Sequence, residues 1–316
     1  MDKAHIQTDK QLEEMEKKLG EIYSRASAEI KDKWAAYLKE IEPEISAAQK
    51  AYAAAKRTGN AEEIRKAGRE LSRIEKEKIL MDRHYKNLVE QTAEELAHVN
   101  ESALAYINGE LPKTYVRNFE SVCDGIESAV SGYSFELVDK NTVKKLITEG
   151  DKTLLPKPSQ KTLAKIEKTL KEGKDIRWNT RKINAEVLQG ILQGDSMDKI
   201  AARMRRVTDM NATSAIRNAR TMVTGAENAG RMDMLRQAKE DGVVAKKKWI
   251  AAKDKRTRHW HLELDGVLKD EDEPFTNDYG DIMFPGDPSA HPANVYNCRC
   301  SLGYKVVGFN FNGNSR

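Results

Sequence analysis

The stretch that decides the fold of the C-terminal part lies between residues 249 and 300. It contains Trp249-Ile-Ala-Ala-Lys-Asp254, Arg256-Thr-Arg-His-Trp-His-Leu-Glu-Leu-Asp-Gly266, Phe284-Pro-Gly-Asp-Pro288 and Asn297-Cys-Arg-Cys300. Gly and Pro recur through it and interrupt helical periodicity. Three imidazoles, several carboxylates and two thiols also fall in this stretch, so it carries the densest chemistry of the chain.

Short apolar runs flank and enter this stretch. Val243–Ala245, Trp249–Ala252 and Ser301–Val307 predict short strands. The loop between the last two strands is long and lacks a periodic pattern. A loop of that length normally needs a staple or a function.

Upstream, apolar residues recur at helical spacing. Residues 8–42 predict one helix with a heptad-like seam at Leu12, Met15, Leu19, Ile22 and Ala26. Pro43 is expected to end it, because proline removes a backbone donor. A second helix is predicted over 44–57 and a third over 61–108.

The middle of the chain also predicts helices. Leu154–Pro158 is a turn-rich boundary, and Asp195 or Ser196 is a predicted N-cap. Asn211 or Thr213 is expected to cap a further helix that ends near Gly242.

Together these patterns predict an α+β protein that is predominantly α. We expect a coiled-coil-like helical region over 1–155, a basic helical region over 156–242, a small β-containing module over 243–308 and a disordered tail over 309–316.

Composition narrows the classes of function. The chain has 316 residues, of which 33% are charged and 6% aromatic, and it has three cysteines. We expect neither a signal peptide nor a membrane-spanning segment, because no apolar run reaches the required ~20 residues. Three cysteines make no disulfide framework and indicate the cytoplasm.

The thiols and one imidazole predict a metal site. His261, Cys298 and Cys300 are ligand types that Zn²⁺ prefers. The options for a fourth ligand are His259, Asp265, His291 or water. Two alternatives remain open: the cysteines are small structural residues with His261 hydrogen-bonded to Asp265, or a thiol acts as a nucleophile with a histidine base.

A hydrolytic centre is a further alternative. His259 and His261, with Asp254, Glu263 and Asp265, have residue types that hold a metal and activate water. Their spacing matches no catalytic signature, so we predict no catalytic residue. Turn building explains these residues equally well, and we assign structural roles to Asp254, Arg256, Asp265 and Gly266.

Positive charge is concentrated in the middle of the chain. Between residues 151 and 221 there are sixteen Lys and Arg against eight Asp and Glu. Such a surplus suits contact with nucleic acid, although a solvated helix surface looks the same. The predicted DNA contacts are Lys161, Lys165, Lys168, Arg203, Arg205, Arg206 and Arg217.

The order of the motifs between residues 249 and 300 resembles the C-terminal module of the phage Mu protein F-like head morphogenesis family, the minor capsid proteins of tailed phages. The resemblance spans roughly residues 185–305 and includes Ala219-Arg-Thr221, so Arg220 is expected to form a structural ion pair. Many family members carry Cys-x-x-Cys before Leu-Asp-Gly. Here Arg258 and His261 occupy those places.

The resemblance implies a minor head protein that acts in head morphogenesis, packaging or genome delivery. It would bind the portal protein, with the major capsid or scaffold protein and DNA as further partners, and no membrane. Its expected location is the virion, and the host cytoplasm during assembly. The alternative is a metal-dependent nuclease or a toxin-like effector that uses the His, Asp and Cys residues of the loop.

Overall fold

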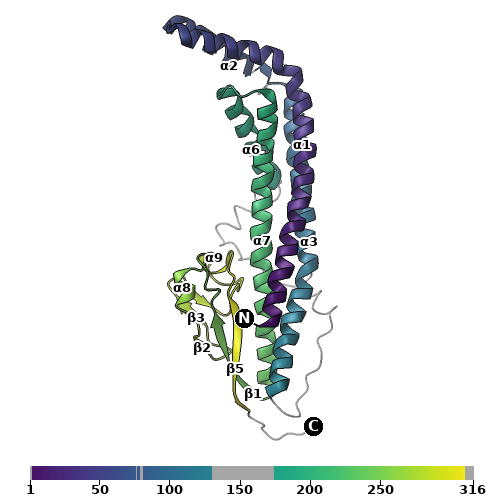
Figure 1. The fold of residues 1–316 in the computed structure, drawn as a ribbon, viewed down its shortest axis with the longest axis vertical. Coiled ribbons are helices and arrows are strands. Elements are labelled where there is room, and N and C mark those ends of the chain that lie inside the picture. Colours follow the sequence, from purple (N-terminus) through teal and green to yellow (C-terminus); the bar gives the residue numbers. More distant parts are fainter. Residues whose placement is uncertain (1, 76, 79–80, 130–173, 310–316) are drawn as a thin grey trace. The chain divides into compact units, whose positions relative to one another are not determined.

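The computed structural model describes residues 2–75, 77–78, 81–129 and 174–309. The chain divides into two compact units. The helical unit comprises residues 19–103 and 160–213, and the sheet-bearing unit comprises residues 1–18, 104–159 and 214–316. The predicted α+β, predominantly α fold is confirmed: long helices are followed by a few short antiparallel strands near the C-terminus (Figure 1).

The first helix, α1, spans Lys3–Thr58 and includes Pro43, so the predicted break at this proline is wrong. Pro43 and Lys39, whose carbonyl loses its partner, are both exposed, so water can satisfy that carbonyl. Ile41 and Ile45, on either side, are buried in the same core. Tertiary packing therefore outweighs the local cost of the proline.

The predicted helix over 61–108 is two helices. Helix α2 spans Ala61–Glu75, and α3 spans Arg83–Ala129. The Asp82 carboxylate accepts a hydrogen bond from the Tyr85 N–H at 2.7 Å, which caps the start of α3. The start of α2 is capped by Asn60, whose side-chain oxygen accepts from the Glu62 N–H at 2.9 Å.

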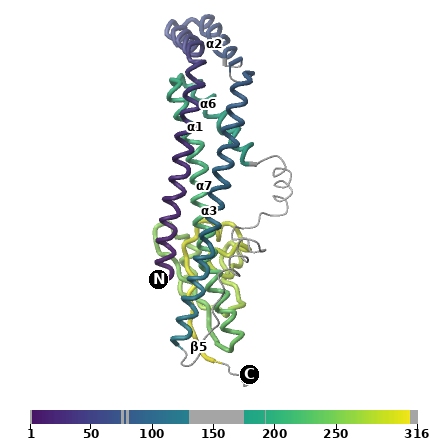
Figure 2. Tube along the Cα trace, turned by 90° about the vertical axis from the view of Figure 1, so that its right-hand side faces the viewer, coloured from purple at the N-terminus to yellow at the C-terminus, as the bar shows by residue number. Residues whose placement is uncertain are grey.

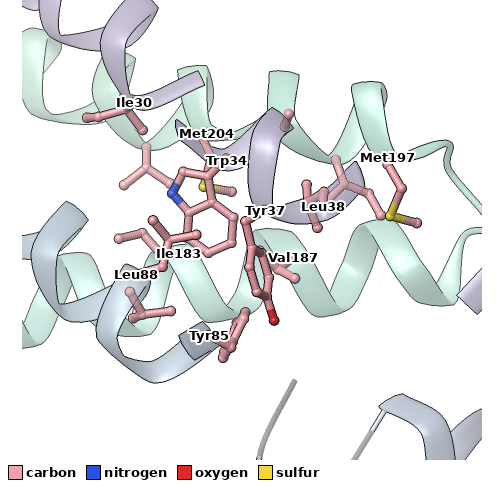
Figure 3. Close-up of a cluster of buried hydrophobic side chains, with 14 of the residues drawn as sticks. Ile30, Trp34, Tyr37, Leu38, Tyr85, Leu88, Ile183, Val187, Met197 and Met204 are labelled. Atoms are coloured by element: carbon pink, nitrogen blue, oxygen red, sulfur yellow. The ribbon is translucent and has the colours of Figure 1, made fainter. Parts of the chain in front are cut away.

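The core of the helical unit is apolar and drawn from four helices. Helices α1 and α3 pack with α6 (Lys174–Leu192) and α7 (Met197–Glu240), which run side by side in this unit (Figures 1 and 2). Trp34 lies at the centre of the cluster, fully buried (Figure 3). Its ring meets Tyr85 edge-on at 5.9 Å, and its Nε1–H donates to Thr92 Oγ1 at 3.0 Å. Much of the apolar stripe of α1 is therefore buried within the chain.

Helix α7 begins where predicted but continues further. The Ser196 hydroxyl accepts from the Lys199 N–H at 3.4 Å, which confirms the predicted cap. The cap expected at Asn211 or Thr213 is wrong, because α7 runs through both. Asn211 is buried, and its Nδ2 donates to Asn179 Oδ1 at 3.0 Å and to its own helix at Val207 O.

In the sheet-bearing unit, β1 (Val243–Ile250) is the central strand of a sheet ordered β2-β1-β5. Its antiparallel neighbours are β2 (Leu268–Lys269) and β5 (Ser301–Phe309). A second pair joins β3 (Phe275–Asn277) to β4 (Gly280–Ile282). The predicted strands are thus confirmed, with the first two merged into β1.

Helix α7 packs closely on α3 in this unit. A Cβ on Gly230 would lie 2.4 Å from the Tyr115 carbonyl oxygen, so only glycine fits there. Tyr115, Val116, Phe119 and Val122, which the sequence places on one helix face, are all buried in α3.

Several sequence predictions lie outside the described residues. They include the boundary after residue 155 and all but the first residue of the predicted tail over 309–316. Among the described helices, none combines the length and apolar character that crossing a membrane requires.

Candidate metal centre

His261, Cys298 and Cys300 come together in the sheet-bearing unit. His261 lies on the short helix α8 (His259–Leu262), while Cys298 and Cys300 lie between α9 (Pro292–Val295) and the start of β5. Both Sγ atoms are 3.7 Å from His261 Nδ1. The three ligand atoms all lie within 4.8 Å of one another, and each residue is at most 2% exposed. Both cysteines are free thiols.

One face of α7 holds the Cys-Arg-Cys backbone in place. Thr221 Oγ1 accepts from the Asn297 N–H at 3.1 Å, and the Thr224 hydroxyl donates to the Cys298 carbonyl at 2.7 Å. The Asn228 side chain accepts from the Leu302 N–H at 2.7 Å and donates to the Cys300 carbonyl at 3.2 Å. Asn228 thus pairs with β5 as a neighbouring strand would.

Sequence reasoning missed these three helix residues. Their spacing of three and four places them on one face of α7. The sequence does place these polar residues on the apolar, Ala-rich face of the helix. It does not indicate which backbone groups they contact.

The local backbone also positions the thiols. Asn297 adopts a left-handed conformation with φ 56°, and the Cys298 N–H donates to the Val295 carbonyl at 3.1 Å. The Arg258 guanidinium donates to the Tyr296 carbonyl, which ties the residue before α8 to the residue after α9. These contacts bring the two ends of the long loop together.

The two thiols influence one another. The Cys298 thiol holds the pKa of Cys300 well below its ordinary value, and the His261 imidazole adds to this effect. The same contact with Cys300, together with burial, raises the pKa of Cys298. The contact between the two thiols therefore favours ionisation of Cys300 over ionisation of Cys298.

Packing, rather than hydrogen bonding, orients the far side of the imidazole. Among the described residues, no group partners the buried His261 Nε2. The Trp249 ring meets the imidazole edge-on at a centroid distance of 5.2 Å. A cavity of about 10 Å³ adjoins the cluster.

The three protein side chains considered as a fourth ligand lie elsewhere. Asp265 accepts from the Ala251 N–H at 3.0 Å and pairs with Lys253 Nζ at 2.6 Å. The exposed His291 caps α9 by accepting from the Ala293 N–H at 3.2 Å. His259 is exposed and lies edge-on to Trp260. In the described part of the chain, the metal-binding group contains only His261, Cys298 and Cys300.

The residues assigned structural roles build the loop. Asp254 accepts from the Arg256 N–H at 2.8 Å and pairs with Arg299, with 2.6 Å between Nη2 and Oδ1. Gly266 has φ 82°, a conformation that glycine adopts without strain, and its N–H donates to the Trp249 carbonyl. The His261–Asp265 hydrogen bond, which was the alternative to a metal site, does not form: His261 Nδ1 faces the thiols.

The residues of the alternative hydrolytic centre are dispersed by the same contacts. Asp254 is bound to Arg299 and Asp265 to Lys253, and neither belongs to the group around His261. The described residues therefore offer a site of one imidazole and two thiols, without a carboxylate.

The predicted DNA contacts have varied surroundings. Arg203 is 8% exposed and ion-paired with Asp195 and Glu186, so its guanidinium cannot reach a phosphate. Arg205 and Arg206 are exposed, and Arg217 is exposed with its guanidinium 5.4 Å from the Tyr296 ring centre. Lys161, Lys165 and Lys168 lie outside the described residues. Arg220 pairs with Glu16, as expected of a structural ion pair.

A buried ionic network, which the sequence did not reveal, fastens the N-terminus to this unit. His5 Nδ1 lies 2.7 Å from Glu227 Oε1, and both side chains are at most 4% exposed. Arg231, on the same helix as Glu227, pairs with Asp2 and donates to the β5 carbonyl of Leu302. Burial lowers the pKa of His5, but contact with Glu227 outweighs it, so the net shift is upward.

Comparison with known proteins places this region. Residues 181–303 match the family described as Phage Mu protein F like protein. This segment of the chain is therefore similar to that family. The resemblance seen in the sequence is thereby confirmed. The Mu F-like segment, residues 181–303, contains the cluster of His261, Cys298 and Cys300 together with Thr221, Thr224 and Asn228.

Relatives of this chain differ in their names. Minor head protein GP7 of Bacillus phage SPP1 is 36% identical over 124 residues, which are 39% of each chain. The NAD(+)--arginine ADP-ribosyltransferase EFV of Enterococcus faecalis is 34% identical over 119 residues, or 38% of this chain and 24% of that protein. Uncharacterized protein YqbB of Bacillus subtilis is 28% identical over 132 residues, or 40% of this chain and 42% of that protein.

The matched part thus spans less than half the length of each of these relatives. No solved structure matches the chain.

Proposed function

We propose that this chain is a minor head protein of a tailed phage and that its Mu F-like segment acts as a binding module in head morphogenesis. The observation that carries the proposal is the 36% identity to Minor head protein GP7 over 124 residues, in a chain whose Mu F-like segment spans residues 181–303. The proposed location is the virion, and the host cytoplasm during assembly.

A non-catalytic role for the segment is supported by the different names of the proteins that share it. Similarity extends to a protein named a minor head protein and to one named an ADP-ribosyltransferase, of which the matched residues form only 24%. A segment shared by proteins of such different names is more simply a docking module than a reaction centre. The contacts of Asp254 and Asp265 described above agree with this interpretation.

The experiment is deletion of the gene in the phage or prophage that encodes this chain, followed by complementation. We expect heads assembled without the chain to lose infectivity, and mass spectrometry to find the chain in purified heads of the complemented phage. Fully infectious particles that lack the chain would overturn the proposal.

The proposed partner is the portal protein, with the major capsid or scaffold protein as the other head components in reach. Co-expression with each of these proteins from the same genome, followed by size-exclusion chromatography, distinguishes them. Co-elution with the portal protein alone supports the portal. Co-elution with capsid or scaffold protein alone would show that the segment binds a component of the head shell and not the portal protein.

DNA is a second proposed partner, contacted by exposed arginines of α7. The Arg205 and Arg206 side chains are 77% and 59% exposed. Arg205 lies 3.6 Å from Asp209, which is also exposed, and such exposed pairs are weak. Arg206 lies 3.3 Å from Glu186, whose side chain is 14% exposed. Arg205 can therefore exchange Asp209 for a DNA phosphate at little cost in free energy.

Duplex binding tests this step. We expect the affinity to fall steeply with salt, and R205A combined with R217A to lower it further. The matched control is R65A combined with R69A, two exposed arginines of α2. Equal losses in both double variants, or affinity that is independent of salt, would exclude a specific role for the α7 arginines.

The competing function is a nuclease or toxin-like effector, and the name of the Enterococcus relative is what favours testing it. Purified chain is assayed for plasmid nicking with added divalent metals and for transfer of ADP-ribose from NAD⁺ to arginine. Turnover that disappears in H261A would replace the binding role with an enzymatic one.

A further inference from the structure

We propose that His261 Nδ1 and the sulfurs of Cys298 and Cys300 bind one Zn²⁺, with a water molecule as the fourth ligand. The inference concerns the folded chain itself and does not depend on the head-assembly role. It rests on three observations: the spacing of the ligand atoms, their shared burial, and a small cavity beside them.

The spacing fits a tetrahedral ion. Zn²⁺ with bonds of about 2.3 Å to sulfur and about 2.0 Å to nitrogen separates a sulfur from a nitrogen by roughly 3.6 Å. Both Sγ atoms lie 3.7 Å from His261 Nδ1. Binding therefore requires little movement of these side chains.

The chemistry of the donors selects the metal. Two thiols and one imidazole are soft and borderline ligands, which Zn²⁺ accepts and which Mg²⁺ and Ca²⁺ do not. Two thiolates neutralise the charge of one Zn²⁺, so the complex is neutral in its buried surroundings. Each thiol gives up its proton to solvent as its sulfur binds the ion, and no electron is transferred.

The positive charges around the cluster disfavour cations that protein ligands do not neutralise. Three arginines line the cavity, namely Arg256, Arg258 and Arg299, and they repel such a cation. The Arg258 guanidinium donates to the Tyr296 carbonyl and supplies no metal ligand. The described residues therefore offer the ion three protein ligands.

The cavity determines what completes the coordination. Its volume of about 10 Å³ is close to what one water molecule needs. Nothing the size of a substrate fits there. The ion would thus act as a clasp that joins α8, at one end of the long loop, to the Cys-Arg-Cys turn at the other.

The test begins with metal analysis of the purified full chain. We expect about one Zn²⁺ per chain, and Co²⁺ exchanged into the site should show the visible absorption of a tetrahedral sulfur-ligated ion. C298S, C300S and H261A should each retain less than about a fifth of the zinc. C123S is the matched control, because Cys123 is buried in α3 outside the cluster and should leave the zinc content unchanged.

A measurement on the wild type guards against variants that fail to fold. A strong chelator should remove the zinc and lower the melting temperature by several degrees, and added Zn²⁺ should restore it. Purified chain that takes up no Zn²⁺ when dialysed against it, or zinc that survives in all three variants, would overturn the site. Either result would leave the deletion experiment on the head role untouched.

Discussion

The apolar core of the helical unit and the surroundings of the candidate metal centre are held together in different ways. In the helical unit, Trp34 and its neighbours make a continuous apolar cluster from four helices. Around the candidate metal centre of the sheet-bearing unit, hydrogen bonds from buried polar side chains hold the backbone. Thr224 and Asn228 bind the Cys-Arg-Cys carbonyls, and Arg231 binds the Leu302 carbonyl of β5. Long periodic helices bury a continuous apolar surface, whereas the loop of fifty residues, with its two-residue and three-residue strands, is also fastened by polar side chains of α7.

The largest expected effect is in the apolar core. W34A removes a fully buried indole at the centre of the cluster and should lower the free energy of unfolding by about 3–5 kcal/mol. Urea denaturation measures this loss. If polar contacts hold the metal centre separately, the zinc content of folded W34A should equal that of the wild type.

A smaller effect is expected where a polar side chain holds the backbone around the two cysteines. N228A leaves the Leu302 N–H and the Cys300 carbonyl without their partner, at a cost of about 2–4 kcal/mol. Denaturation and a zinc-affinity titration should both show the loss. The control is T213A, an exposed position on the same helix, which should change neither.

The buried pair of His5 and Glu227 makes part of the stability depend on pH. The pKa of His5 is raised in the folded chain, so its contribution is fully present below the unfolded value of about 6.5 and is lost as pH rises through the folded value. We expect H5Q to lose about 1–2 kcal/mol at pH 6 and much less at pH 9. An equal loss at both pH values would show that His5 contributes through packing rather than charge.

The smallest effect is expected at an exposed pair. Lys33 Nζ lies 2.6 Å from Glu95 Oε2, and its side chain is 53% exposed. K33A should cost no more than about 0.5 kcal/mol by urea denaturation. A loss as large as that of N228A would contradict the view that burial, rather than the number of polar contacts, decides their strength.

Periodicity predicted most of the fold because helices and strands place apolar residues at fixed spacings. It failed at Pro43, where buried neighbours on both sides keep α1 intact. It also failed at Asn211, which resembles a cap but is buried and bonded to Asn179. In both places a contact distant in the sequence overrode a local preference.

The candidate site was predicted in part. Residue type was enough to select His261, Cys298 and Cys300, since few side chains bind Zn²⁺. The fourth ligand was not predictable, because Asp265 and His291 have other partners that only the folded loop reveals. The positive charge of the region likewise suggested Arg203 as a DNA contact. In the structure Arg203 is buried, and its charge is neutralised by Asp195 and Glu186.

Hydrogen exchange measured by mass spectrometry, with and without a zinc chelator, tests most directly the contrast between the apolar helical core and the surroundings of the proposed zinc site. We predict that chelation speeds exchange in peptides from the loop and the start of β5, residues 251–302, and leaves peptides from the buried core around Trp34 and Ile183 unchanged. Exchange that is unaltered by chelation in residues 251–302 would contradict a metal-clasped module held by polar groups.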